Sequence, residues 1–355
     1  MSVVTDVEEE ITQLWYTRCP VPTASGLAYS LGWLRDGYAG DGVEIGILQE
    51  APLEIARHHF DHDLVGLLRE GGNVPAFAAR ADGAPTRLIG LTWIEELQSI
   101  VVRPDAGIRE PSDLRGARLG VPAWASTRDT SMGRAMALHG FLSALRLGGL
   151  TWDDVTLVEI PIEPVVPPRD GDARSFERAW PGLAQLVDGQ VDAIYLKGGS
   201  AVEAIEQAGA VVGINLDLYP DKRVRVNNGT PRPLTVHQQL LDDHPELVVQ
   251  FLVQTLRAAE WAEGNPDRVR EILAREVRSG AHGVEVAYGE QLHTSLRPSL
   301  SDERLELFDR QKEFLLLYGF LARDFDLAGW VDHEPLRAAR EIVAAGGGPT
   351  GGSPS

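Results

Sequence analysis

A single thiol, a short run of histidines and an arginine before two glycines are the residues of this chain whose types suggest chemistry. Cys19 is the only cysteine in 355 residues, so it cannot form an intramolecular disulfide and supplies at most one metal ligand. The segment Pro20-Val21-Pro22 follows it and predicts a rigid extended backbone, not a helix face. Most free cysteines are small buried hydrophobic residues. Residue type alone therefore favours packing, and a reactive role depends on the neighbours of the thiol.

The histidine run contains His58, His59 and His62. His58 and His62 are four residues apart and can share one face of a helix. Three or four ligands are typical of a protein metal site, and no second cluster of ligand residues accompanies this run. We therefore expect no bound metal.

Arg69 stands two residues before the glycine pair Gly71 and Gly72. Two glycines allow a tight turn whose backbone N–H groups can point at an anion. The arginine would add a planar set of donors with a fixed positive charge. The same residues are equally typical of an ordinary helix that ends at glycine. Both interpretations stay open on these residues alone.

Charge and composition exclude several kinds of partner. The formal net charge of −19 disfavours nucleic acid and anionic membrane surfaces, although a local arginine can still bind a small anion. Residues 1–10 have no basic start and no apolar core, unlike a signal peptide. No apolar run approaches the ~18 residues of a membrane span. With one free cysteine, these features predict a cytoplasmic protein. We expect it to act as a monomer on a small anionic molecule.

Strand and helix patterns alternate along most of the chain, which is typical of an α/β protein. Strands are expected at 43–48, 87–93, 99–103, 118–121, 155–160 and 189–195. Helices are expected at 131–147, 176–187, 245–252 and 304–317, and the chain beyond residue 237 should be almost wholly helical. The glycine- and proline-rich segment 346–355 cannot form a core and is expected to be disordered.

Two segments resemble the second lobe of periplasmic-type solute-binding proteins. One runs over residues 101–122 and ends in Gly120-Val121-Pro122, and the other is Gly189-Gln190-Val191-Asp192-Ala193. The resemblance implies a type II two-lobe α/β fold with the ligand between the lobes. It places the first lobe at residues 1–101 plus 230–345 and the second at 102–229. The chain would cross between them near residues 102 and 230.

The residues around the thiol resemble the family of aromatic sulfinate desulfinases that act in dibenzothiophene desulfurisation. The similar segments are Tyr16-x-x-Cys19-Pro20-Val21-Pro22, His59-Phe60 and Arg69-x-Gly71-Gly72-x-Val74-Pro75. Less specific similarity at 310–316 and 327–330 extends the resemblance over about residues 10–335. It implies an enzyme without metal or cofactor, in which Cys19 is the essential thiol, His59 its partner and Arg69 the sulfinate anchor. The Gly71–Gly72 turn would supply backbone donors.

The chemistry of these side chains agrees with such roles. A sulfinate is an anion with two oxygens, which suits an arginine and backbone N–H groups. In the reaction R–SO2⁻ plus water giving R–H and sulfite, the carbon must gain a proton. The Cys19 thiol can give that proton while His59 tunes its ionisation. Alternatively, a Cys19 thiolate attacks sulfur and forms a thiosulfonate-like intermediate that water resolves, with His59 as base. The sequence leaves both routes open.

Further candidate substrate-binding residues lie at positions where this chain differs from the family. Arg18 replaces the family's asparagine before the cysteine, and Thr17 is next to it. From the second lobe, the residues expected to line the cleft are Trp124, Ser126, Tyr195 and Lys197. Lys197 and the glycines after it replace a tryptophan-rich segment of the family. This replacement predicts a more polar sulfinate than a biphenyl.

Two other functions fit the same scaffold. A non-catalytic solute-binding protein for a sulfonate-like or other small anion fits the fold equally well, but it predicts an export signal and gives Cys19 no role. A thiamin-pyrimidine synthase relies on a cysteine-rich iron-binding segment and a pyridoxal-bound lysine, which a single cysteine fits badly. The leading prediction is therefore a cysteine-dependent sulfinate desulfinase.

Overall fold

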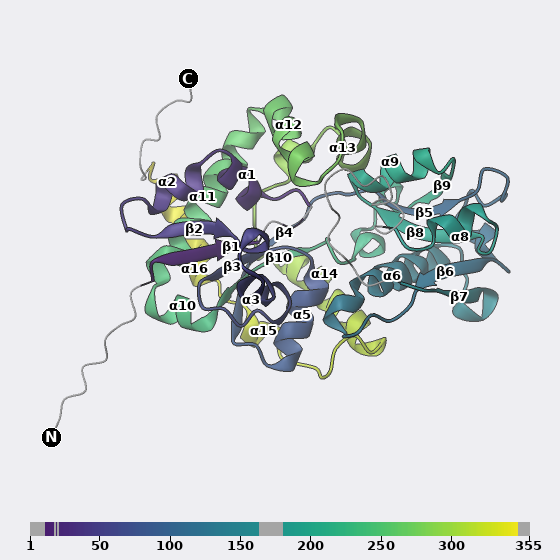
Figure 1. The fold of residues 1–355 in the computed structure, drawn as a ribbon, viewed down its shortest axis with the longest axis horizontal. Coiled ribbons are helices and arrows are strands. Elements are labelled where there is room, and N and C mark those ends of the chain that lie inside the picture. The colour runs from purple at the N-terminus through teal and green to yellow at the C-terminus, as the bar shows by residue number, and fades with distance from the viewer. Residues whose placement is uncertain (1–10, 18, 20, 163–179, 347–355) are drawn as a thin grey trace.

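The computed structural model describes residues 11–17, 19, 21–162 and 180–346, and it contains two five-stranded sheets side by side (Figure 1). In the first sheet the strand order is β2-β1-β3-β10-β4, formed by Glu44–Ile47, Gln13–Tyr16, Leu67–Glu70, Arg232–His237 and Thr86–Thr92. In the second the order is β7-β6-β8-β5-β9, formed by Thr156–Ile160, Arg118–Pro122, Ala193–Lys197, Gln98–Val102 and Val211–Asn215. Each sheet is the centre of one lobe.

Each sheet is mixed and contains one strand that runs against its neighbours. β1 pairs in parallel with β2 and β3, whereas β10 is antiparallel to both β3 and β4. In the second sheet, β6 is parallel to β7 and β8, whereas β5 is antiparallel to β8 and β9. The antiparallel strands β5 and β10 are those that the chain enters directly after passing from one sheet to the other. This arrangement confirms the predicted α/β fold with two lobes.

Helices cover both sheets (Figure 1). Those of the first lobe before the crossing are α1 Ala24–Ser30, α2 Trp33–Tyr38, α3 Leu53–Ala56, α4 His58–Asp61 and α5 Asn73–Asp82. The second lobe has α6 Met132–Leu147, α8 Leu183–Val187 and α9 Gly199–Gln207. The chain then returns and forms α10 Gln238–Asp243, α11 Pro245–Glu263, α12 Pro266–Glu276, α13 Ala281–Tyr288, α14 Asp302–Leu317, α15 Leu327–Trp330 and α16 Glu334–Ala344. Because α11 packs on α1, α2 and α16, both ends of the described chain build the first lobe.

The first crossing lies earlier than the sequence suggested. The expected strand 99–103 is β5, which pairs with β8 and β9, so it belongs to the second sheet and the chain crosses at residues 93–97. The prediction of a crossing near residue 102 is therefore wrong. An apolar strand shows that it will be buried but not which sheet it will join, because its partners are distant in sequence. The return passage lies between β9 and β10, in residues 216–231.

Two further differences concern local structure. Residues 67–70 form strand β3, so the interpretation of Arg69 as part of a helix ending at glycine is wrong. The helix expected at 176–187 is present only as α8, and its residues 176–179 lie outside the described residues, as do residues 347–355 of the predicted disordered tail. Within the described part of the chain, none of the helices has the length and apolar character needed to cross a bilayer.

Candidate active site

The thiol follows β1 and is held at the end of the first sheet by Thr17. The Thr17 hydroxyl donates to the carbonyl of Glu70 at 3.0 Å and accepts from the Glu70 N–H at 3.1 Å. Its own N–H donates to the carbonyl of Leu68 at 3.3 Å. These bonds tie the end of β1 to the end of β3 and bring Cys19 next to Arg69. Thr17, predicted to bind substrate, is buried and already engaged in this way.

The glycine pair is required for space. A methyl group on Gly71 would lie 2.7 Å from the sulfur of Cys19 and 3.3 Å from Nη2 of Arg69, and one on Gly72 would lie 2.6 Å from the Asn228 amide nitrogen. Neither glycine is among those with positive φ. The strand-to-helix junction between β3 and α5 is therefore so tightly packed that any side chain here would displace the Cys19 sulfur or the Asn228 amide, and no left-handed backbone is involved.

The backbone donors predicted at this turn are largely engaged. The Gly71 N–H donates to the carbonyl of Pro233 at 3.3 Å. At the start of α5, the N–H of Asn73 donates to the Asn228 carbonyl at 2.7 Å, and that of Val74 donates to the Asn228 side-chain oxygen at 2.8 Å. An anion at this position must therefore depend mainly on a side chain.

That side chain is Arg69, which is only 2% exposed. Its Nη2 donates to the carbonyl of Gly72 at 2.9 Å, whereas Nε and Nη1 are buried without a hydrogen-bond partner among the described residues. Burial lowers the pKa of the guanidinium, and the neighbouring Cys19 opposes this shift. No described carboxylate accepts a hydrogen bond from it, and a buried charge without a counter-ion is costly. Arg69 is therefore a buried cation near the thiol, with two nitrogens that have no partner among the described residues.

His59 lies on α4, near enough to Arg69 for the arginine charge to act on its ring. The side-chain nitrogen of Gln49 lies 3.4 Å from its Nδ1. Burial, reinforced by the charge of Arg69, lowers the pKa of His59 to about 3, so its ring is neutral at pH 7. No hydrogen bond joins His59 to Cys19 in the described residues, and each is connected to Arg69 electrostatically. Such bonds often form only when substrate is bound, so the partnership of thiol and imidazole remains a prediction.

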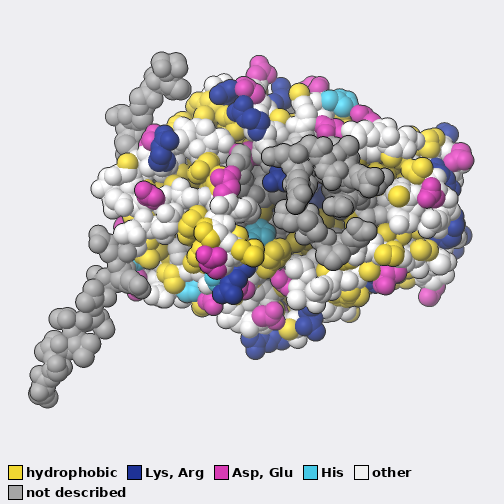
Figure 2. Space-filling model, viewed as in Figure 1, with side chains coloured by type: hydrophobic (Ala, Val, Ile, Leu, Met, Phe, Trp, Pro, Cys, Tyr) yellow, Lys and Arg dark blue, Asp and Glu magenta, His cyan; other side chains and the backbone are white. Residues whose placement is uncertain are grey.

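The remaining histidines do not form a metal centre. His58 bonds Asp61 at 2.7 Å, and His62 is buried with its Nε2 3.0 Å from the backbone carbonyl of His59. Within the described residues, no group of three or more His, Cys, Asp or Glu side chains could hold a metal ion. Figure 2 shows histidine side chains reaching the surface of the first lobe around α3.

Two of the predicted cleft residues of the second lobe lie in the junction between the lobes. Lys197 forms a buried ion pair with Glu96, so its charge is already matched. The Tyr195 hydroxyl donates to Gln98 at 2.8 Å and accepts from Asn227 at 3.1 Å. Lys197 therefore does not present a free cation to a ligand. Lys197 therefore no longer supports the expectation of a more polar substrate.

The other two cleft candidates lie elsewhere on the lobe boundary. Trp124 packs against Phe320 with tilted rings whose centroids are 4.6 Å apart, and it lines a surface hollow with Ser126 and Asp82, the last residue of α5. Arg69 and Gly72 lie at the opposite end of α5. A ten-residue helix is about 15 Å long, so the structure does not bring Trp124 or Ser126 to the thiol. Arg18 lies outside the described residues.

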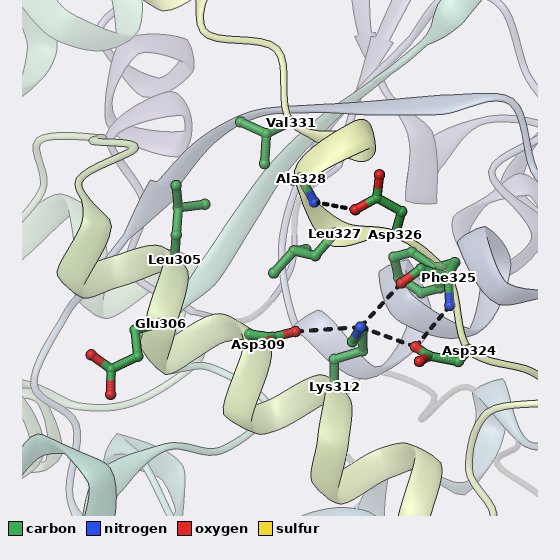
Figure 3. A pocket seen from close by; sticks show the side chains of 10 residues that line it. All are labelled: Leu305, Glu306, Asp309, Lys312, Asp324, Phe325, Asp326, Leu327, Ala328 and Val331. Atoms are coloured by element: carbon green, nitrogen blue, oxygen red, sulfur yellow. Dashed lines mark hydrogen bonds and ion pairs between the residues drawn. The ribbon is translucent and has the colours of Figure 1, made fainter.

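A hollow of about 740 Å³ between α14 and α15 is not a second candidate for this chemistry (Figure 3). The only cation that lines it, Lys312, is bonded to Asp309 and Asp324 and donates to the Phe325 carbonyl at 3.0 Å. Its remaining lining is apolar or acidic. No nucleophilic side chain lies there.

Sequence reasoning missed the residues that brace the Arg69 end of the site from a distance. Asn228 satisfies the start of α5, and the amide of Asn73 donates to the carbonyls of Asn227 at 2.7 Å and Pro231 at 2.9 Å. Asn227 in turn donates to the Met136 carbonyl in the second lobe at 3.1 Å. More than 150 residues separate Asn73 from Asn227, and no local pattern signals such a contact.

Comparison with known proteins gives the same picture. Residues 32–168 match the family described as "NMT1/THI5 like". The chain is 29% identical to the 2'-hydroxybiphenyl-2-sulfinate desulfinase of Rhodococcus erythropolis, over 91% of this chain and 92% of the relative. It is 22% identical to the riboflavin-binding protein RibY of Chloroflexus aurantiacus, over 92% of this chain and 80% of that one.

Solved structures agree. A cysteine-to-serine mutant of the enzyme DSZB, in complex with biphenyl-2-sulfinic acid, is 27% identical and superimposes with a TM-score of 0.74, covering 93% of this chain and 99% of that one. The aliphatic sulphonate-binding protein SsuA of Escherichia coli is 16% identical with a TM-score of 0.64, covering 91% and 92%, and shows the shared fold. Over most of its length this chain is therefore similar to the 2'-hydroxybiphenyl-2-sulfinate desulfinases, as the residues around Cys19 predicted, and it has a periplasmic-binding-protein-like fold.

Proposed function

We propose that this protein is a sulfinate desulfinase, which cleaves the C–S bond of an organic, aromatic sulfinate with water and releases sulfite. The observation that carries the proposal is a free thiol, Cys19, placed close to a buried arginine, Arg69, that has no carboxylate partner among the described residues. The likeness over most of the chain to a sulfinate desulfinase supports it.

Arg69 binds the sulfinate. Its Nε and Nη1 supply N–H donors for sulfinate oxygens, and the anion provides the counter-charge that the described residues do not. Donors fixed in a buried site interact strongly with charge because little solvent screens them. The substrate sulfur is then held near the thiol of Cys19, since the Cys19 sulfur and the Arg69 guanidinium both lie within 3.4 Å of the position that a Gly71 methyl group would take.

The chemical step has two balanced forms. In one, Cys19 S–H gives its proton to the substrate carbon, the C–S electron pair forms the new C–H bond, and the departing SO2 takes up water to become sulfite, with one proton returning to the thiolate. In the other, His59 takes the thiol proton, the thiolate attacks sulfur, and the C–S electron pair leaves with the carbon, which takes that proton from His59 to give R–H; water then cleaves the S–S bond of the intermediate, which yields sulfite and the thiol. Neutral His59 is the base available for either form. No electron acceptor or cofactor is needed, since both forms only consume water.

We further propose that the substrate is aromatic and that the enzyme works as a cofactor-independent, monomeric hydrolase in the cytoplasm. The desulfinase relatives support the aromatic substrate. A lone free cysteine suits a reducing compartment.

The second candidate function is reversible binding of a sulfonate-like anion without catalysis. The similarity of fold to the sulphonate-binding protein SsuA favours it, and Arg69 would serve it equally well. The two functions differ in the need for Cys19, because a binding protein makes no use of a thiol.

Sulfite release from a panel of aryl and alkyl sulfinates tests the proposal, with wild type compared with Cys19→Ser. We expect sulfite from the wild type, and no sulfite but retained ligand binding from Cys19→Ser. Full activity in the serine variant would refute the thiol mechanism. Intact ligand bound by the wild type, with no sulfite from any sulfinate, would show the binding function instead.

A further inference from the structure

A second buried arginine lies at the end of the first sheet, and the proposed reaction does not use it. Arg232 is 0% exposed and is the first residue of β10. Because β10 runs antiparallel to β3, its first residue lies at the edge of the sheet where the parallel strands β1 and β3 end. Cys19 follows β1 at this same edge. The topology therefore brings Arg232 to the end of the sheet that carries the thiol.

The guanidinium of Arg232 makes one hydrogen bond among the described residues, and that bond reaches the segment after the thiol. Nη1 donates to the backbone carbonyl of Pro22 at 2.7 Å. Nε and Nη2 are buried without a hydrogen-bond partner in the described part of the chain. A buried guanidinium is costly unless bonds of good geometry offset its desolvation. The single bond therefore points to a role for Arg232 in the segment that it holds.

The chain between this bond and the thiol is short and stiff. The N–H of Val21 donates to the carbonyl of Cys19 at 2.7 Å, which closes a three-residue turn. The ring of Pro22 fixes its own φ. A displacement of the Pro22 carbonyl is therefore passed on to Cys19 and is not absorbed by the residues between them.

Other side chains hold the two ends of this segment. Before the thiol, Thr17 is bonded to the backbone of Glu70. After it, the hydroxyl and N–H of Ser25 donate to the Glu70 carboxylate at 2.5 and 3.3 Å. Among the described bonds from side chains of other strands, the middle of the segment depends on the one from Arg232.

The far side of the guanidinium lies beside the buried ion pair at the junction of the lobes. A methyl group on Gly229, in the return passage, would lie 2.8 Å from Nζ of Lys197 and 2.9 Å from Oε2 of Glu96. The same methyl group would lie 3.2 Å from Nη2 of Arg232. The three charged groups therefore surround one point of the backbone, and the carboxylate attracts the guanidinium to this place.

We propose that Arg232 is a positioning residue that fixes the Cys19 thiol through the Pro22 carbonyl. Without this bond the segment moves and the sulfur leaves its place near Arg69. The proposed sulfinate anchor stays intact, because Arg69 lies on β3 and keeps its own bond to the Gly72 carbonyl at 2.9 Å. Arg232 thus acts on the reaction step and not on binding. Its effect on catalysis rests on the proposed desulfinase function, whereas its effect on the thiol does not.

Two substitutions separate this role from that of a buried charge. Arg232→Lys keeps the positive charge beside Glu96, but its side chain is one bond shorter and ends in a single nitrogen, which that carboxylate attracts. Arg232→Met removes the charge as well. Both variants lose the bond to the Pro22 carbonyl. Arg304→Lys is the matched control, because Arg304 on α14 also donates to a backbone carbonyl, that of Leu91 at 2.6 Å, outside the thiol segment.

The experiment measures kcat and KM for sulfite release, and the rate at which iodoacetamide alkylates Cys19 in the free protein, with urea unfolding to establish that each variant is folded. We expect both Arg232 variants to lower kcat about 10- to 100-fold with little change in KM, since a misplacement of about 1 Å can cost about 100-fold. Alkylation of Cys19 should become several-fold faster, because the half-buried thiol is released from its segment. Arg304→Lys should behave as wild type.

Wild-type kcat and alkylation in Arg232→Lys, with losses only in Arg232→Met, would show that the residue supplies charge alone and would overturn the proposal. A raised KM at unchanged kcat would overturn it too, as would equal changes in Arg304→Lys. If the wild type releases no sulfite, the proposed function fails, and the alkylation rates alone then decide whether Arg232 positions the thiol.

Discussion

Replacing Gly71 by alanine tests the position of the thiol near the arginine more sharply than removing either side chain. The added methyl group would lie 2.7 Å from the Cys19 sulfur and 3.3 Å from Nη2 of Arg69. Unstrained non-bonded contacts are about 3.5–4.0 Å, so the sulfur must move by about 1 Å or rotate away from Arg69. A misplacement of about 1 Å can cost about 100-fold in rate. The rest of the fold changes little, because a cysteine side chain rotates easily.

We therefore expect Gly71→Ala to lower kcat for sulfite release by about 100-fold while unfolding in urea changes by no more than about 1–3 kcal/mol. Gly133→Ala on α6 is the control, since the nearest atom to its methyl group would be Pro122 Cγ at 4.0 Å. Its kcat should equal that of the wild type. Wild-type kcat in Gly71→Ala would refute the reasoning, because the sulfur would then not need its present position.

Three further outcomes follow from buried charges. Arg69→Met should stabilise the free protein, since an uncompensated charge is removed, and should weaken binding of a sulfinate by at least about 100-fold in calorimetry; unchanged affinity would contradict the role of Arg69. Lys197→Met should lower the free energy of unfolding in urea by about 3–5 kcal/mol, because it leaves Glu96 buried without its partner. The double variant Lys197→Met with Glu96→Gln should recover most of this loss. A single variant as stable as the wild type would contradict the ion pair. His139 bonds Gln311 at 2.6 Å, and its pKa is lowered to about 4 mainly by burial. The neutral ring therefore stabilises the fold above pH 6.5, and this stability is lost as the pH falls toward 4. The expected loss in unfolding free energy is about 3 kcal/mol, at 1.36 kcal/mol per pKa unit. The slope of unfolding free energy against pH should flatten in His139→Gln, and an unaltered slope would assign it to other groups.

The sequence predicted the part of the site that depends on neighbouring residues. Cys19 with its prolines and Arg69 with its glycine pair lie in short segments of the first lobe, and their similarity to one family was enough to join them. The reason for Gly71 and Gly72, however, differed from the expected turn with free backbone donors. They leave room for the Cys19 sulfur and the Asn228 amide, a requirement that appears only when three segments are packed together.

The parts that the sequence did not predict depend on contacts between distant segments. A lysine at the end of an apolar strand looks like a free cation, yet Lys197 meets Glu96 about 100 residues away and is neutralised. The first crossing was misplaced for the same reason, since β5 is assigned to the second lobe only by its pairing with β8 and β9. His62 was considered only as a metal ligand, because its bond to the His59 carbonyl cannot be read from spacing.

A mass balance on purified wild-type protein with an aromatic sulfinate such as biphenyl-2-sulfinate, in the presence of a metal chelator, tests the proposed desulfinase function most directly. We expect sulfite and the protonated arene to appear in equal amounts over many turnovers, and prior alkylation of Cys19 to abolish both. Quantitative recovery of the intact sulfinate, bound to the protein but not cleaved, would contradict it.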